Sequence, residues 1–249
     1  MNRPYFGQAL CGLAIFLALF GGSIGCAYAG AFSVNPVRVN LSATQPVAAI
    51  TVRNQSSEPT LVQLDTFVWS QSLGKDVTVP SSDVLATPPI FTLAPNGTQI
   101  VRVGLRRPAG AATSESTYRL TLREVPPKKP TPGLTVTLLV SMPVFVAPAA
   151  ATAPNLHWRV TRAADKKLNV LATNSGTAHA QIVKLDISAG GKSLGNRTVA
   201  EYVLPGNTRL WTVDTSAAPA VGTKLKIAST TDLGASDMEV PLEGPVEAP

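Results

Sequence analysis

The stretch from Tyr118 to Phe145 reads YRLTLREVPP, then KKPTPG, then LTVTLLVSMPVF. Side chains of a β-strand point to opposite faces in turn, so the second half places an apolar row on one face. The row consists of Leu134, Val136, Leu138, Val140, Met142 and Val144. The other face carries Thr135, Thr137, Leu139 and Ser141. Two interpretations are open: a buried strand of this protein's own core, or a strand that lends its row to another protein.

The rest of the chain shows almost no helical periodicity. Short β-branched runs recur between clusters of Pro, Gly, Asn and Ser, which is typical of all-β sandwich domains. In the first half the predicted strands are 33–40, 47–54, 60–70, 90–93, 99–106, 117–125 and 134–147. In the second half they are 156–161, 167–173, 181–188, 198–203, 208–213, 224–229 and 238–241. Two immunoglobulin-like sandwiches are therefore expected.

The N-terminus has the pattern of a secretory signal peptide. An apolar run at 9–20 is followed by Ala27-Tyr28-Ala29, a small-residue cleavage site. We expect cleavage after Ala29, with Ala29-Gly30-Ala31 as a second site. A lipoprotein signal at Cys26 is the alternative, although no large aliphatic residue stands three positions before it. Both cysteines, Cys11 and Cys26, lie in this segment, so the predicted mature chain relies on core burial for stability.

Residues 148–154, PAAATAP, are small and apolar with a proline at each end, which is typical of an interdomain joint. We therefore predict a signal peptide at 1–29 and an N-terminal immunoglobulin-like domain at 30–148 that contains the alternating strand. A C-terminal β-sandwich domain is predicted at 149–249.

Charge and hydropathy argue against nucleic-acid binding and membrane insertion. The formal net charge is +6, but the basic pairs are few and have no interleaved aromatic residues. No segment after the signal peptide approaches the length of about 18 apolar residues that a membrane span requires. We expect a chain that is not membrane-embedded and does not bind nucleic acid.

Candidate catalytic and metal-binding groups are scarce. The two histidines, His157 and His179, lie next to apolar residues, without cysteines or a close His/Asp cluster. The Gly191-Lys192-Ser193 sequence lacks the earlier glycine of a phosphate-binding loop. We expect no enzyme activity, no metal and no cofactor.

Several blocks resemble the periplasmic pilus-assembly chaperones of bacterial chaperone–usher systems. They are FSVNPVRVNL at 32–41, ATPPIFTLAPNGTQIVRV at 86–103, LREVPP at 122–127 and, more weakly, TDLG at 231–234. Three further blocks resemble the archaic branch of that family: VWSQSLGKD at 68–76, SMPVFVAP at 141–148 and NSG at 174–176.

The resemblance implies a fold and a function. It implies two immunoglobulin-like domains in an L-shaped arrangement with an interdomain cleft. Pilus subunits of this kind lack a strand, and chaperone–pilin complexes are an established case of strand addition. Leu134, Val136, Leu138 and Val140 would fill the subunit's core, and four such side chains give about 6–12 kcal/mol before ordering costs. The chaperone would then deliver the subunit to an outer-membrane usher.

The resemblance also implies roles for charged residues. Arg38 would bind the subunit's C-terminal carboxylate, since a guanidinium group suits two carboxylate oxygens. The family's second anchor, a lysine, corresponds to Pro143 here, so Arg119 is the candidate replacement, with Arg123 behind it. Pro143 has no N–H and should interrupt strand pairing.

A second set of charges would be structural. Arg102, Glu124 and Asp232 align with the family's buried salt-bridge network, which fixes the angle between the domains. Glu124→Ala should then lower stability, because a buried charge loses its partner. The loop at 128–133 is short and lacks additional alternating hydrophobic residues.

Other functions are compatible with parts of the sequence. A secreted β-sandwich structural protein or adhesin is the main alternative. A carbohydrate-binding module would need an aromatic platform, whereas Trp69, Trp158 and Trp211 are spaced as separate core or rim residues. The chaperone could also self-associate through the donor strand when no subunit is bound.

Overall fold

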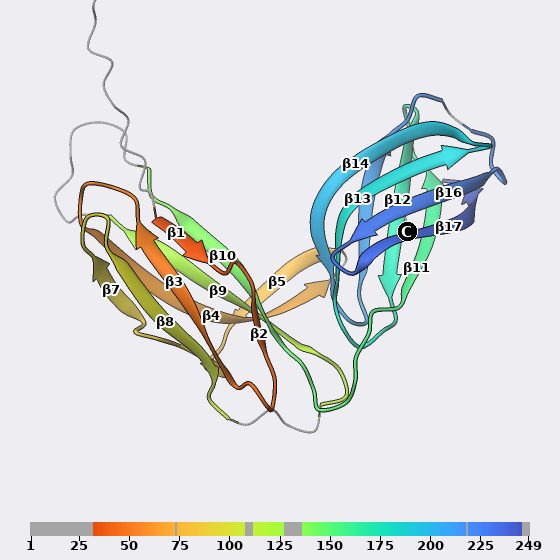
Figure 1. Ribbon diagram of the computed structural model, residues 1–249. Helices are drawn as coiled ribbons and strands as arrows, with labels where there is room; N and C mark the ends of the chain where they lie inside the picture. The colour runs from red at the N-terminus through yellow and green to blue at the C-terminus, as the bar shows by residue number, and fades with distance from the viewer. Residues whose placement is uncertain (1–31, 73, 108–111, 127–135, 218, 246–249) are drawn as a thin grey trace, which may run out of the picture.

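The computed structural model describes residues 32–72, 74–107, 112–126, 136–217 and 219–245. All regular secondary structure within these ranges is β-strand. The strands form two sandwich domains that meet at an angle in an L shape (Figure 1). The all-β, two-sandwich prediction is confirmed. The described residues contain no helix suited to cross a bilayer.

The described residues of the N-terminal domain form ten strands in two sheets. The strands are β1 (Phe32–Asn35), β2 (Val39–Leu41), β3 (Val47–Asn54), β4 (Thr60–Ser72), β5 (Lys75–Pro80), β6 (Val84–Thr87), β7 (Ile90–Leu93), β8 (Thr98–Leu105), β9 (Ser116–Val125) and β10 (Leu139–Val146). One sheet has the order β1-β3-β8-β6, and the other has the order β2-β10-β9-β4-β5 with β7 also paired to β4. Their inner faces enclose one hydrophobic core.

Seven strands lie in the part of the C-terminal domain that the structure describes. They are β11 (Leu156–Arg162), β12 (Lys167–Asn174), β13 (Ala180–Ala189), β14 (Lys192–Val203), β15 (Thr208–Asp214), β16 (Lys224–Thr231) and β17 (Gly234–Glu243). Hydrogen bonds connect them in the order β14-β13-β16-β17-β11-β12-β15, wrapped around a second core. No strand lies between Val146 and Leu156, where the joint was predicted; the domain boundary itself stays a prediction.

The structure differs from the predicted strands at several places. Strand β10 begins at Leu139, although 136–138 were predicted as strand, and β14 begins at Lys192 rather than at Thr198. The single strand predicted at 33–40 is divided into β1 and β2, because the chain crosses from one sheet to the other around Pro36, which lacks an N–H. Strands β5 and β6 were not predicted. All six residues of β5 are exposed, so this strand has no buried face whose alternation could reveal it.

A buried asparagine closes the end of a core strand in each domain. Asn54 ends β3 and Asn174 ends β12, and both are fully buried. The Asn54 Nδ2 donates to the carbonyls of Glu58 and Ala94, and its Oδ1 accepts from Ser56 N. These bonds stand in for backbone pairs where the strand ends.

The corner at Asn174 has the same construction. Its Nδ2 donates to the carbonyls of Ala178 and Val203, and its Oδ1 accepts from the backbone N–H groups of Asn155 and Gly176. A Cβ at Gly176 would lie 2.3 Å from the carbonyl oxygen of Ala153. The NSG motif at 174–176 therefore has a structural role.

Candidate functional site

The predicted donor row begins before β10 and runs along that strand into the core of its own domain. Val136, just before the strand, is 53% exposed, Leu138 and Val140 are half-buried against that core, and Met142 and Val144 are fully buried. Leu134 lies outside the described residues. The two interpretations of the row thus apply to different parts of it: its C-terminal part is the domain's own core, and its N-terminal part is exposed.

Among the described strands, one edge of β10 is paired along only part of its length. On one side β9 pairs with the whole strand, from Leu139 to Val146. On the other side β2 is the partner among the described strands, and it pairs in parallel only from Val144 to Val146. Backbone groups from Leu139 to Pro143 on that side are thus available to another chain.

Pro143 was expected to interrupt strand pairing, but the ladder with β9 continues through it. It lies opposite Arg119 within a continuous register. A residue's N–H points to one side of a strand only, so a missing N–H leaves the ladder on the other side intact. Pairing on the β2 side begins at the next residue, Val144.

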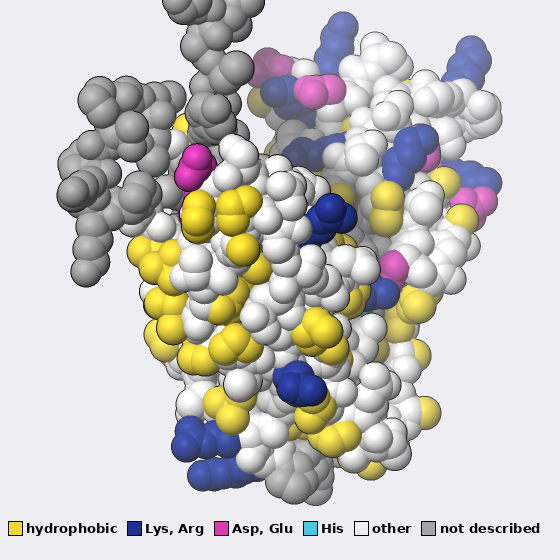
Figure 2. Space-filling model, turned by 60° about the vertical axis from the view of Figure 1, so that its left-hand side comes forward, with side chains coloured by type: hydrophobic (Ala, Val, Ile, Leu, Met, Phe, Trp, Pro, Cys, Tyr) yellow, Lys and Arg dark blue, Asp and Glu magenta, His cyan; other side chains and the backbone are white. Residues whose placement is uncertain are grey.

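Hydrophobic side chains are exposed on the N-terminal domain beyond β10. Figure 2 shows them gathered on the face of this domain that is turned to the viewer. The most exposed large hydrophobic residues that the structure describes in this domain are Val37, Val47, Leu85, Ile90, Val79, Ile100, Val136 and Leu139. Exposed apolar surface of this kind is typical of proteins that bind other proteins.

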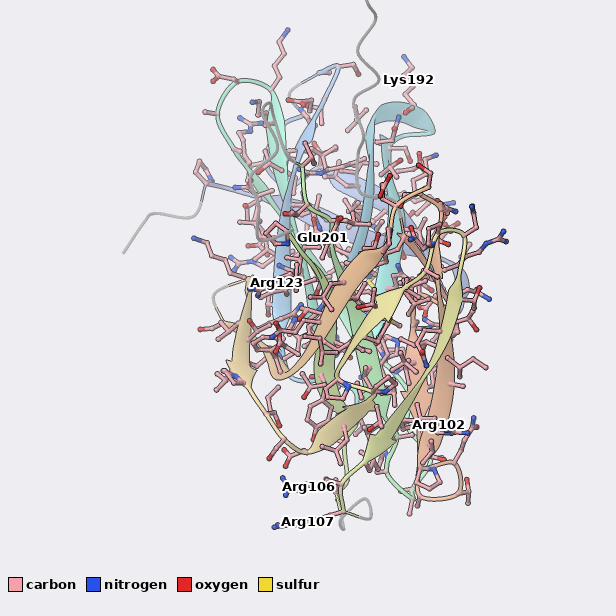
Figure 3. The ribbon with its side chains drawn as sticks, turned by 90° about the vertical axis from the view of Figure 1, so that its left-hand side faces the viewer. Arg102, Arg106, Arg107, Arg123, Lys192 and Glu201 are labelled. Atoms are coloured by element: carbon pink, nitrogen blue, oxygen red, sulfur yellow. The ribbon has the colours of Figure 1, made fainter. Side chains whose placement is uncertain are left out.

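The predicted network of Arg102, Glu124 and Asp232 is not formed by these three described residues. Arg102 is exposed on β8 between the buried Val101 and Val103, so it points away from the core. Figure 3 shows Arg102 and Arg123, the neighbour of Glu124, on opposite sides of the N-terminal domain.

Glu124 lies too far along β9 to contact the C-terminal domain. The residue that does so is Glu115, nine positions earlier, which at about 3.4 Å per residue corresponds to roughly 30 Å of strand. Glu124 instead binds the start of the donor strand. Its Oε2 accepts from the Leu138 N–H at 3.0 Å, and its own N–H donates to the Leu138 carbonyl.

This geometry changes the expected effect of Glu124→Ala. One hydrogen bond is lost, so the free energy of unfolding should fall by only about 1 kcal/mol. Arg102→Ala, at an exposed position, should change it by less than about 0.5 kcal/mol. Urea unfolding of both variants tests this. A loss of several kcal/mol in the free energy of unfolding of each variant would contradict this prediction and support the interdomain network.

Arg38 lies at the interdomain cleft, between β1 and β2. Its Nη1 forms an ion pair with Asp232 Oδ2 of the C-terminal domain at 2.9 Å. Burial lowers the pKa of Arg38, but the hydrogen bond to Asp232 and the proximity of Tyr202 raise it by more. Beside the pair is a hollow of about 220 Å³ that Asn40 and Leu233 also line.

His179 contacts both domains across the cleft. Its Nδ1 is 2.7 Å from Glu115 Oε1 of the N-terminal domain, and its Nε2 is 3.8 Å from Asp232 Oδ2. The ring stacks on Phe145 of β10 with a centroid distance of 3.6 Å. Sequence reasoning treated His179 as a structural residue, and the partners that make it an interdomain contact lie far away in sequence.

Arg119 lies deeper in the domain interface, on β9. Its guanidinium group is 3.7 Å above the Trp69 ring and 3.5 Å from Asp76 Oδ2. Burial lowers the pKa of Arg119, Asp76 and Tyr202 act against this, and Arg209 adds to the lowering.

Tyr202 connects the two predicted anchors. Burial raises its pKa, while the positive charges of Arg38 and Arg119 act in the opposite direction. The Tyr202 ring centroid is 5.6 Å from that of Trp69, which Arg119 covers, and 5.5 Å from that of His179, which faces Asp232, the partner of Arg38. Arg123, opposite Leu139 on β9, is exposed.

The hairpin of β4 and β5 reaches from the N-terminal domain to the C-terminal domain (Figure 1). The Gln71 side-chain amide donates to the Tyr202 carbonyl and accepts from Leu204 N–H. Arg209 binds the Gly74 carbonyl and the Asp76 carboxylate. The described contacts that hold the two domains together therefore include this hairpin, which sequence reasoning missed.

The tryptophans are core residues. Trp69 packs with Phe145, Leu204 and Tyr202 at the domain interface. Trp158 and Trp211 share the C-terminal core, with ring centroids 6.2 Å apart. These two were expected to lie at separate sites, and this expectation is wrong.

The fold is similar to those of known proteins. A chain of the crystal structure of the CsuC–CsuE chaperone–tip adhesion subunit complex, from the archaic Csu pili of Acinetobacter baumannii, matches with a TM-score of 0.63 and 20% identity. The match covers 87% of this chain and 100% of that one. The E. coli chaperone DraB matches with a TM-score of 0.58 and 20% identity, over 87% of this chain and 98% of that one.

The crystal structure of the Salmonella enterica SafA pilin with the SafB chaperone matches at a TM-score of 0.57 and 22% identity, over 86% and 98% of the two chains. At these identities the likeness concerns the fold. No curated protein sequence matches the chain. Residues 31–152 match the family model of the pili and flagellar-assembly chaperones, PapD N-terminal domain. Residues 31–152 thus form an N-terminal domain of the pilus-assembly chaperone family.

Proposed function

We propose that this protein captures pilus subunits by donating β10 to their incomplete sandwich. The observation that carries the proposal is the open edge of β10 beside an exposed apolar row on a domain of the chaperone family. A subunit strand would pair with the backbone from Leu139 to Pro143. Val136, Leu138 and Val140, with Leu134 before them, would fill its core.

The exposure of each side chain in the free protein limits the hydrophobic free energy that it can contribute on binding. Val136 loses the most solvent contact on binding, whereas Leu138 and Val140 are already half-buried. The hydrophobic contribution of the row is therefore smaller than the full 1.5–3 kcal/mol for each side chain. Backbone hydrogen bonds along the open edge add affinity that does not depend on the subunit's sequence.

The cleft supplies the second contact of the proposed complex. The subunit's C-terminal carboxylate would bind at Arg38, with Arg119 as a more buried second cation near the same tyrosine. Tyr202 packs against Trp69, which Arg119 covers, and against His179, which faces Asp232, and this arrangement supports a common anion site. A carboxylate here would fix the end of the subunit's chain and thereby the register of its pairing with β10.

The proposal includes the cellular setting. The predicted signal peptide at 1–29 supports export to the periplasm, and the family supports delivery of the subunit to an outer-membrane usher. The fold match to the Csu complex and the three sequence blocks support the archaic branch. Without a subunit, the open edge of β10 would favour self-association.

Arg38→Ala should weaken capture. A hydrogen bond between charged groups contributes about 1.5–3 kcal/mol, so we expect affinity to fall by tenfold or more. The test is co-expression with candidate subunits of the same bacterium, followed by affinity purification and titration of the recovered complex. Arg102→Ala, at an exposed arginine of the same domain, is the control and should bind like wild type. Equal subunit recovery by all three proteins would contradict the anchor.

A further inference from the structure

The guanidinium group proposed to anchor the subunit is already bound to a carboxylate of this chain. Arg38 and Asp232 are 194 positions apart and belong to different domains, yet their side chains form a 2.9 Å ion pair. An incoming carboxylate that binds the same nitrogen, Nη1, must replace Asp232 or share the donor with it.

The pair is positioned for exchange. The Arg38 side chain is 36% exposed and that of Asp232 is 16% exposed, so solvent screens the attraction between them. The hollow of about 220 Å³ beside the pair is lined by Arg38, Asp232 and His179. The end of another chain could reach Arg38 from there without passing through either domain.

Asp232 would keep other partners after losing Arg38. Its Oδ1 accepts from the Gln181 N–H at 3.1 Å, and its backbone N–H donates to the Gln181 carbonyl. His179 Nε2 is 3.8 Å from the oxygen that Arg38 would leave. The carboxylate would therefore not become an unpaired buried charge.

The angle between the domains does not depend on the pair alone. Gln71 binds Tyr202 and Leu204, Arg209 binds Asp76, and Glu115 binds His179, all across the interface. These contacts can persist while Arg38 changes partner, so exchange requires a local side-chain movement rather than a domain rotation.

We propose that Asp232 is a built-in competitor: its carboxylate occupies Arg38 in the empty chaperone, and the subunit's C-terminal carboxylate replaces it on capture. The inference rests on the proposed function and concerns the regulation of the same site. In the empty state Asp232 holds the guanidinium group at the cleft. It also lowers the affinity of Arg38 for any carboxylate, so that a weak carboxylate ligand without the support of β10 pairing is excluded.

The test uses Asp232→Asn, which removes the charge but keeps an oxygen for the Gln181 N–H. The probe is a labelled synthetic peptide with the C-terminal sequence of the subunit recovered by the wild-type chaperone, titrated by fluorescence anisotropy. It is made with a free carboxylate and as the C-terminal amide. We expect Asp232→Asn to bind the acid peptide about two- to fivefold more tightly than wild type, and the amide peptide equally.

Asp237→Asn is the matched control. Asp237 is an exposed carboxylate of the same domain, paired with Lys226 at 2.7 Å, and its loss changes the net charge equally. Its affinity for both peptides should equal that of wild type. Equal or weaker binding of the acid peptide by Asp232→Asn would overturn the proposal, because Asp232 would then only orient Arg38.

A measurement on the wild-type protein avoids dependence on the variant's folding. In NMR titrations, the Asp232 side-chain carboxyl carbon and the Arg38 guanidinium signals should shift together with the acid peptide and not with the amide. A shift at Arg38 alone would again overturn the exchange. Arg38→Ala separates the two proposals. If it binds the acid peptide like wild type, the anchor itself is wrong. If it binds weakly while Asp232→Asn gains nothing, only the competitor is wrong.

Discussion

Val136→Glu is expected to abolish stable capture of a subunit while leaving the chaperone folded. Val136 is 53% exposed, so a charge there is solvated in the empty protein. In the proposed complex it would enter the subunit's apolar core, where the lost burial and the buried charge together cost at least about 2 kcal/mol. Affinity should fall roughly thirtyfold or more.

The measurement compares subunit recovery and affinity with those of Ile100→Glu. Ile100 is 58% exposed on β8, in the sheet that does not contain β10, so it controls for an added charge on this domain. Leu138→Glu should also lose the subunit, but its half-buried position predicts some loss of stability too. Capture by Val136→Glu at wild-type affinity would show that the exposed row does not enter the subunit.

Asn174→Ala is expected to lower the free energy of unfolding by about 3 kcal/mol. The fully buried amide satisfies the carbonyls of Ala178 and Val203 and the N–H groups of Asn155 and Gly176. Each buried polar group left without a partner costs about 1–3 kcal/mol, and relaxation of the loop recovers part of the sum.

Chemical denaturation of wild type and variant measures the effect. Asn196→Ala, at an exposed asparagine of β14, is the control and should change stability by less than about 0.5 kcal/mol. A loss of under 1 kcal/mol for Asn174→Ala would show that water replaces the amide at this corner. The prediction concerns stability and is independent of subunit binding.

The alternating row and the all-β class could be read directly from the sequence. Period-two alternation from Leu134 to Val144 depends only on the geometry of an extended chain, so a local pattern is sufficient to identify it. The same pattern could not show where the row changes from donor surface to core. That depends on β2, which covers the edge only from Val144 onward.

The partners of the charged residues could not be identified from a local pattern. Arg38 was selected by resemblance and Arg119 as the replacement for the family's lysine, and the positive charges of both act against the rise that burial causes in the pKa of Tyr202. Asp232 was assigned to Arg102 and Glu124, but it pairs with Arg38 because its turn between β16 and β17 faces the start of β2. The sequence around a charged residue does not indicate which residue of another domain it will pair with.

The sequence by itself thus determined the fold class and the alternating row, since each is recorded in a local pattern, while resemblance to a family selected Arg38. The tertiary structure decided what holds the domains together: the β4–β5 hairpin, the Glu115–His179 contact and the Arg38–Asp232 pair. These depend on how two separately folded sandwiches dock. Docking brings together side chains more than sixty positions apart, and short-range periodicity is insensitive to that distance.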